Sequence, residues 1–235
     1  MRFFVAEKQK IYVVLATLLA VVVAGFAILS PMTVYVIRRT SKTPTIVIDA
    51  GHGGADAGVT GKTTGMKESE LNLDIAMLLG DMLKAAGMQV VFTRTNDTML
   101  NIVKSDTKKR SDMFSRAQII NSVKADVVVS IHMNYFPSEV RRGAQVFFAR
   151  KDGEAFRLAT CVQDSLNAIN EEQTGRLYSP LTADKYILTC SSAISIIVEC
   201  GFLSNPSDEK LFESPEYRAR IAEAIVRGIR EYLCI

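Results

Sequence analysis

The 235-residue sequence lacks several features from which common functions are inferred. It contains two histidines and four cysteines, and the cysteines form neither a CxxC pair nor a zinc-finger spacing. Its glycine-rich segment, residues 49–54, matches neither of the glycine patterns that bind nucleotide phosphates. The formal net charge of +3 is too small to indicate a nucleic-acid partner, and no repeat of about 20–50 residues occurs. These absences argue against zinc-finger, nucleotide-binding, nucleic-acid-binding and repeat proteins.

Both histidines follow short apolar runs that favour β-strands. His52 follows residues 45–48, and His132 follows residues 127–131. In open α/β sheets, binding and catalytic sites lie at the carboxyl ends of the strands. The two imidazoles are therefore expected at that edge. Two histidines and one carboxylate, with one position left open, form a common catalytic zinc site.

Two glutamates are candidates to complete such a site. Glu68 stands where an amphipathic helix is expected to begin, and Glu199 closes an apolar run expected to form a strand. An unpaired charge is costly to bury, so Glu199 requires a partner or a chemical role. Asn134 is close enough in sequence to His132 to line the site, and Asp49 is a candidate to orient a ligand imidazole.

Each of these residues also has a simpler interpretation. His52 can be a loop histidine, and Glu68 or Glu70 can offset the dipole at a helix N-terminus. Glu199 can form a buried ion pair with an arginine. Cys200 offers a different chemistry, because a thiol at a strand end with a histidine nearby can act as a nucleophile. The competing interpretation of Cys200 is a small core residue without a disulfide.

Four blocks of sequence resemble one enzyme family when taken in order. They are Gly51-His-Gly-Gly54, Lys67-Glu68, Ser130-Ile-His132 and Val198-Glu199-Cys-Gly-Phe-Leu-Ser-Asn-Pro206. Together they are similar to the zinc-dependent N-acetylmuramoyl-L-alanine amidases of the Amidase_3 type, over roughly residues 44–233. The segment 132–147, with its HMN, PS and GAQ elements, is similar to the CwlD-like amidases of endospore-forming bacteria.

The resemblance implies a ligand set and a reaction. It implies that His52, Glu68 and His132 bind one zinc ion and that Glu199 is the catalytic acid and base. The implied substrate is peptidoglycan, cut at the amide between muramic acid and L-alanine, and in the CwlD-like case in the spore cortex before muramic-δ-lactam forms. An accessory protein is an open possibility. A Cys200-dependent hydrolase and a non-catalytic wall-binding or regulatory protein remain the alternatives.

The N-terminal part of the chain is apolar. We expect a cytoplasmic tail at residues 1–10, a transmembrane anchor at 11–37 and a linker at 38–44, because residues 11–29 carry no charge. Small residues at 25–27 leave a cleaved signal peptide as the alternative. The domain is expected on the extracytoplasmic side, membrane-anchored, or secreted if the segment is cleaved. This placement depends on the implied substrate, since positive charges flank the segment on both sides.

Residues 45–235 are predicted to form a single α/β domain. Alternating strand and helix patterns favour a twisted, mostly parallel, mixed sheet of about six strands flanked by helices. Residues 96–110 are expected to be a solvated loop, and residues 171–185 an irregular segment bordering the cleft. The predicted strands are 45–50, 88–93, 127–132, 144–149 and 193–199, and the predicted helices are 71–83, 111–123, 154–170 and 217–233.

Overall fold

The computed structural model describes residues 17–19, 43–149 and 153–235. The compact unit that carries the chemistry is Thr43–Ile235. The predicted tail and nearly all of the predicted anchor and linker lie outside the described residues. Within the part that is described, no helix has the length and hydropathy needed to cross a membrane. The expected anchor therefore stays a prediction.

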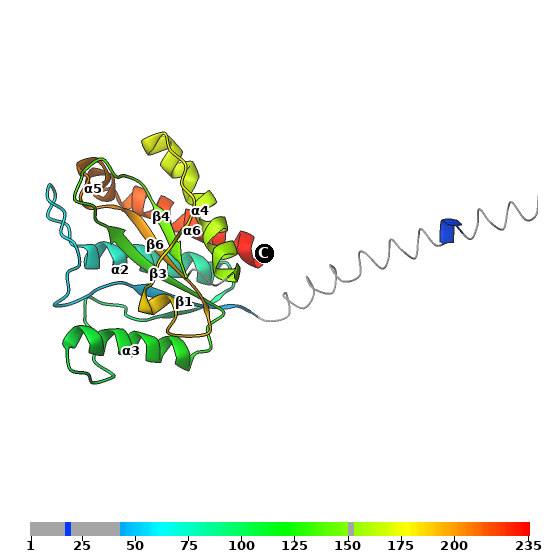
Figure 1. The fold of residues 1–235 in the computed structure, drawn as a ribbon, viewed down its shortest axis with the longest axis horizontal. Coiled ribbons are helices and arrows are strands. Elements are labelled where there is room, and N and C mark those ends of the chain that lie inside the picture. The colour runs from blue at the N-terminus through cyan, green and yellow to red at the C-terminus, as the bar shows by residue number, and fades with distance from the viewer. Residues whose placement is uncertain (1–16, 20–42, 150–152) are drawn as a thin grey trace, which may run out of the picture. The chain divides into compact units, whose positions relative to one another are not determined.

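A six-stranded mixed sheet forms the centre of this unit (Figure 1). Its spatial order is β2-β1-β3-β6-β4-β5. The first four strands in this order are parallel, β4 is antiparallel to β6, and β5 is parallel to β4. The predicted mixed α/β sheet is thus confirmed. The strands are β1 (Thr45–Ala50), β2 (Gln89–Phe92), β3 (Val127–Asn134), β4 (Gln145–Phe148), β5 (Leu181–Thr182) and β6 (Ile194–Phe202).

Helices cover both faces of the sheet. One face is covered by α2 (Glu68–Ala85), α4 (Gly153–Thr174) and α6 (Pro215–Leu233), which also pack on one another. The other is covered by α3 (Lys108–Ser122) and the short 3₁₀ helix η1 (Tyr186–Leu188). In Figure 1, α3 accordingly lies on the side of the sheet opposite α2 and α6.

Successive residues of each strand contribute to opposite faces, as the pleat of a strand requires. In β1, Ile46 and Ile48 belong to the large core under α2, α4 and α6, whereas Val47 belongs to a small cluster under α3. Asp49 lies two residues after Val47 in β1, so its side chain is on the same face, under α3. The α3 face therefore becomes polar towards the carboxyl ends of the strands.

Several element boundaries differ from the predictions. α3 begins at Lys108, inside the stretch expected to be a loop, because the side chain of Thr107 caps its N-terminus by accepting a hydrogen bond from the Arg110 amide. β6 continues to Phe202, so Glu199 lies within the strand instead of ending it. The short helix α5 (Pro206–Phe212) was not expected; Asn205 caps it and Pro206 starts it.

Candidate metal centre

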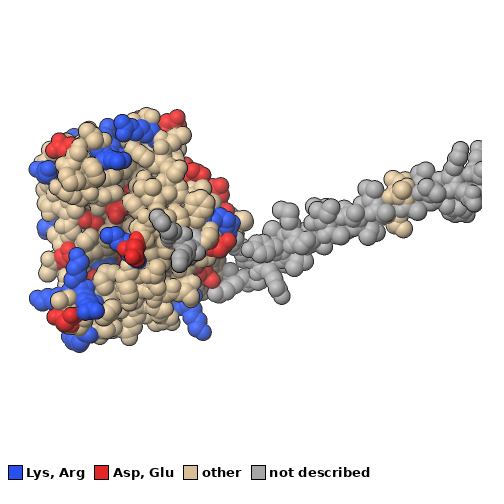
Figure 2. Space-filling view, viewed as in Figure 1, with Lys and Arg blue, Asp and Glu red and all other residues tan. Residues whose placement is uncertain are grey.

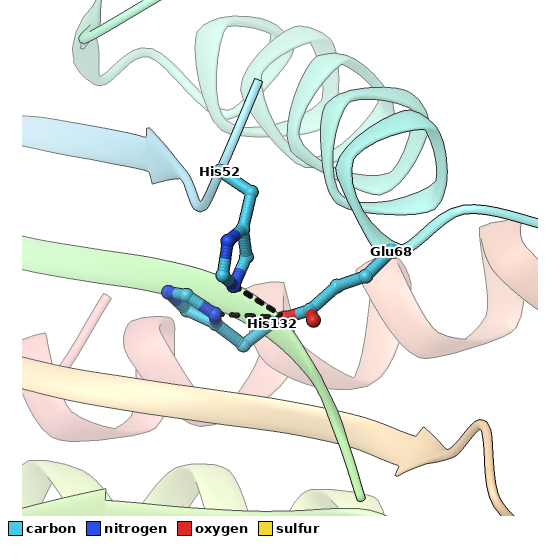
Figure 3. Close-up of side chains that lie close together, drawn as sticks. All are labelled: His52, Glu68 and His132. Carbon is cyan, nitrogen blue, oxygen red and sulfur yellow. Dashed lines mark hydrogen bonds and ion pairs between the residues drawn. The ribbon is translucent and has the colours of Figure 1, made fainter. Parts of the chain in front are cut away.

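Three side chains from separate segments converge at the carboxyl edge of the sheet (Figure 3). His52 comes from the loop after β1, Glu68 from the first turn of α2 and His132 from β3. Their donor atoms all lie within 4.8 Å of one another. Oε1 of Glu68 is 3.2 Å from Nε2 of His52 and 3.0 Å from Nδ1 of His132. The two rings meet edge to face, with centroids 5.1 Å apart.

The main chain holds Glu68 in place. Its side chain is buried, and its carboxylate accepts hydrogen bonds from the amides of Val59 and Met133. Burial raises the pKa of Glu68, but the hydrogen bonds from the two histidines outweigh that effect and hold the pKa well below its usual range. Glu70, its neighbour in the same turn, instead pairs with Lys67 on the surface. Glu68, and not Glu70, therefore belongs to the cluster.

The loop that carries His52 has an unusual backbone. His52 has a φ of 61°, in the left-handed region that few non-glycine residues adopt. Its Nδ1 lies 3.0 Å from Oδ2 of Asp56, on the side of the ring away from Glu68. Burial lowers the pKa of His52, but the neighbouring carboxylates of Glu68 and Asp56 outweigh it and raise the pKa. Asp56 is therefore the carboxylate that pairs with this imidazole on the side away from Glu68.

Asp49 does not orient a ligand, so that prediction was wrong. Its carboxylate accepts hydrogen bonds from Thr93, Ser130 and Arg116, and no contact with an imidazole is present among the described residues. Burial raises the pKa of Asp49, but the Arg116 guanidinium and the two hydroxyl donors lower it to about 2. Asp49 is thus a buried anion that supports the main chain behind the site.

Two glycines allow the ligands to approach the backbone closely. A Cβ on Gly51 would lie 2.2 Å from the Cε1 atom of His132, and one on Gly58 would lie 2.4 Å from Oε2 of Glu68. Both distances are shorter than any real Cβ contact, so neither position accepts a side chain without displacing a ligand. Gly58 also has a φ of +66°, which glycine adopts without strain.

Glu199 faces the same cleft as the cluster. It is directly opposite His132 in the parallel pairing of β3 and β6, so the two side chains are on one face of the sheet. Its Oε2 atom is buried and has no hydrogen-bond partner among the described residues. Burial raises the pKa of Glu199, and the Glu68 charge adds to this, against the opposing effect of His132. The simpler interpretation, a buried ion pair with an arginine, is therefore wrong, because no such pair is present among the described residues.

The cleft around the cluster has a volume of about 500 Å³. Asn134 lines it, as predicted, together with Tyr135 and Tyr186. Lys185, at the end of the expected irregular segment, and Lys109, inside the expected loop, also line it. Figure 2 shows Lys and Arg side chains, with Asp and Glu among them, over the part of the surface where α3 lies. The position of Lys109 at the cleft is not predicted from the sequence, because α3 begins inside the segment 96–110 that is expected to be a loop.

Cys200 is on the wrong face of β6 for catalysis at this cleft. It is fully buried in the apolar core under α2, α4 and α6, whereas Glu199 lines the cleft. Burial raises the pKa of the Cys200 thiol well above its ordinary value, which opposes thiolate formation. All four cysteines are unpaired in the structure. The alternative of a Cys200-dependent hydrolase is therefore wrong, and the core interpretation of Cys200 is confirmed.

The three converging residues fit a metal ion. Two imidazole nitrogens and one carboxylate oxygen face a common point, and the carboxylate supplies a negative charge in a largely buried position. This donor set is the His₂Glu type found in metallohydrolases. His52, Glu68 and His132 can therefore hold a metal ion beside Glu199, at the edge of the sheet where α/β proteins carry their sites.

A mixed α/β sheet with such a cluster at its carboxyl edge fits a class of hydrolases. Residues 46–231 match the family model of the N-acetylmuramoyl-L-alanine amidases, Amidase_3, and the chain belongs to this family. It is therefore an amidase that acts on peptidoglycan. The earlier alternative of a non-catalytic protein is set aside by this membership and by the complete residue cluster.

Individual relatives agree with the family. The chain is 34% identical over 192 residues to the germination-specific N-acetylmuramoyl-L-alanine amidase of Bacillus subtilis (strain 168), covering 80% of this chain and 78% of that protein. The structure of the CwlD amidase from Clostridioides difficile, solved in complex with the GerS lipoprotein, superposes with a TM-score of 0.75 at 33% identity. That superposition covers 82% of this chain and 99% of the CwlD chain. A second amidase, from Clostridium difficile 630, gives a TM-score of 0.71 at 32% identity over 83% and 98% of the two chains.

Proposed function

We propose that this protein hydrolyses the amide between the lactyl group of N-acetylmuramic acid and L-alanine with one zinc ion. His52, Glu68 and His132 would hold the zinc, and Glu199 would act as general base and acid. The observation that carries this proposal is the convergence of the three donor atoms within 4.8 Å, in the cleft that Glu199 also lines. A zinc ion with three protein ligands supplies a water whose pKa is lowered to about 7 and polarises the scissile carbonyl.

Glu199 is suited to move the proton. Its buried Oε2 atom has no hydrogen-bond partner among the described residues, so it is free to accept a proton from the attacking water. The same carboxyl group then donates that proton to the amide nitrogen as L-alanine leaves. Its raised pKa favours the second step, because a carboxyl group that holds its proton more tightly is still protonated when the amine departs.

The cleft suits an anionic glycopeptide. Lys185 lines it and offers positive charge to the free carboxylates of a stem peptide, whereas Lys109 is 3.8 Å from the Asp56 carboxylate. Tyr135 and Tyr186 offer aromatic surface to the sugar. The similarity to a germination-specific amidase supports the spore cortex as the substrate, with stem-peptide removal preceding muramic-δ-lactam formation. The CwlD structure with a lipoprotein supports an accessory protein for this chain as well.

We further propose that residues 11–37 anchor the protein in a membrane with the amidase domain outside the cytoplasm. The uncharged stretch at residues 11–29 and the peptidoglycan substrate support this placement. Cleavage of the segment would release the same domain as a secreted protein.

The test is mass spectrometry of purified peptidoglycan treated with the full-length protein in detergent. Vegetative and cortex peptidoglycan should be compared, each with a zinc chelator and with zinc restored. We expect stem peptides with a free L-alanine amino end, lost on chelation and recovered with zinc. Product release that is insensitive to chelation would contradict the metal mechanism. Equal activity on both substrates would contradict the cortex assignment.

A further inference from the structure

Two arginines are buried behind the metal centre without touching any ligand side chain. Arg94 follows β2 and is 3% exposed, and Arg116 lies in α3 and is 2% exposed. Burying a guanidinium is costly unless all its donors are satisfied. Neither residue takes part in the proton transfers assigned to Glu199. The hydrogen bonds of the two guanidinium groups therefore indicate which parts of the structure they hold in place.

Arg94 joins two of the segments that carry ligands. All four of its hydrogen bonds in the described chain end on main-chain carbonyls. Its Nη2 donates to the carbonyl of Gly51 at 3.0 Å and to that of Ser69 at 2.8 Å. Gly51 precedes His52, and Ser69 follows Glu68. One nitrogen atom therefore fixes the spacing between the His52 loop and the N-terminus of α2.

Arg116 holds the loop of His52 itself. Its Nη1 donates to the carbonyl of Ala50 at 2.7 Å, and its Nη2 donates to the carbonyl of His52 at 2.6 Å. Its charge is balanced by the carboxylates of Asp49 and Asp112. These bonds hold His52 in its left-handed conformation, which is unfavourable for a residue other than glycine.

The third ligand segment is connected to the same network. The hydroxyl of Ser130, two residues before His132 in β3, donates to Asp49 at 2.6 Å. Asp49 in turn accepts from Arg116. The network therefore contacts the main chain or a close neighbour of each of the three residues that converge on the metal position.

We propose that Arg94 and Arg116 are positioning residues that set the affinity of the site for its metal. This inference rests on the proposed zinc site. Lysine cannot replace Arg94, because one ammonium group cannot reach carbonyls on separate segments with the fixed geometry of a guanidinium. The two arginines thus act on the metal through the backbone of its ligands.

The test measures the metal affinity of folded single variants. Full-length Arg94→Lys and Arg116→Lys proteins, freed of metal, are titrated with zinc against a chromophoric chelator, and their cobalt absorption spectra are recorded. The control is Arg142→Lys, which alters the pair with buried Asp208 away from the cleft. We expect zinc affinity to fall about 10- to 100-fold in the first two variants and to stay unchanged in the control. The cobalt spectrum should shift only in the first two.

A milder variant covers the case in which an arginine variant does not fold. Asn72→Ser removes the second side-chain donor to the Gly51 carbonyl, and we expect a smaller loss of zinc affinity in the same direction. Folded arginine variants that bind zinc as tightly as the wild type, with an unchanged cobalt spectrum, would overturn the inference. Failure of the wild type itself to bind zinc would instead overturn the proposed function.

Discussion

The two faces of the sheet are built from alternate residues of the same strands, yet they differ in chemistry along their length. The face under α2, α4 and α6 is apolar from end to end; in β6 it carries Ile196, Val198 and Cys200. The face under α3 carries Ile197 and then Glu199 in the same strand. The first face supplies most of the buried apolar area, and the second supplies the reacting groups.

This difference explains how the protein remains stable although its site contains buried charges, which oppose folding through their desolvation. Burying charges such as Arg94 and Arg116 is costly, because desolvation opposes the attraction of their partners. The apolar face compensates for them through burial of aliphatic side chains. Changes on the apolar face should therefore alter stability, and changes on the α3 face should alter metal binding and turnover.

The largest effect is expected from Glu199→Gln on the α3 face. The amide has nearly the same shape but cannot accept the proton from water, so we expect turnover to fall by about 10²- to 10⁴-fold. Zinc binding should be retained, because Glu199 is not one of the three converging donors. Stem-peptide release and zinc content are measured together, with Glu70→Gln on the surface as the control. Near-normal turnover would remove Glu199 from the mechanism.

Leu158→Ala tests the opposite face. Leu158 lies in α4 and is fully buried in the large apolar core. Truncating a buried leucine costs about 2–5 kcal/mol, so the free energy of unfolding in urea should fall by that amount. Zinc affinity of the folded protein should remain that of the wild type. A parallel loss of zinc affinity under native conditions would show that the two faces are not independent.

Asp49→Asn gives a smaller effect that depends on pH. The pKa of Asp49 is lowered from 3.8 to about 2, so its ionised form stabilises the fold fully above about pH 4. That contribution is lost as pH falls towards 2. Between about pH 5 and pH 2.5, the variant should lose about 1.5 kcal/mol less stability than the wild type.

The control for this comparison is Asp81→Asn, an exposed position that pairs with Lys84. Its urea-unfolding profile should follow that of the wild type across the same pH range. Identical pH profiles for Asp49→Asn and the wild type would contradict the buried-anion role of Asp49.

Cys200→Ala should have the smallest effect on activity. The thiol is in the apolar core and does not face the cleft, so removing it should cost about 1 kcal/mol of stability and leave turnover unchanged. Stem-peptide release is measured beside Cys161→Ala, a half-buried cysteine in α4. Loss of turnover as large as that of Glu199→Gln would restore the thiol mechanism.

Strong periodic patterns made most of the fold predictable. The apolar stretch before His52 and the helical stripe after Glu68 each correspond to an element close to its predicted bounds. The incorrect predictions concern helix starts, which are set by the side chains that cap them. Thr107 caps α3 inside a polar stretch, and Asn205 with Pro206 starts the short α5. Asn205 followed by Pro206 is itself a pattern typical of a helix start.

The sequence predicts the three residues of the cluster but not the residues that contact and hold their segments. His52, Glu68 and His132 were named from their motifs and are brought together in the structure. The sequence predicts Asp49 beside a ligand imidazole, whereas the carboxylate next to His52 is that of Asp56. A carboxylate four residues after His52 carries no pattern that separates it from a surface aspartate. The contacts of Arg94 depend on how strands pair in space, which no local pattern encodes.

The spread of the ligands along the chain has a consequence for how the enzyme matures. Glu68 and His132 are 64 residues apart, and they lie together in a structure in which β1 pairs with β3 and α2 packs on β3. Parallel pairing between distant segments is a slow step in folding, because the intervening chain must first be closed into a loop. The three donor atoms therefore come together only late in folding, when the sheet has formed.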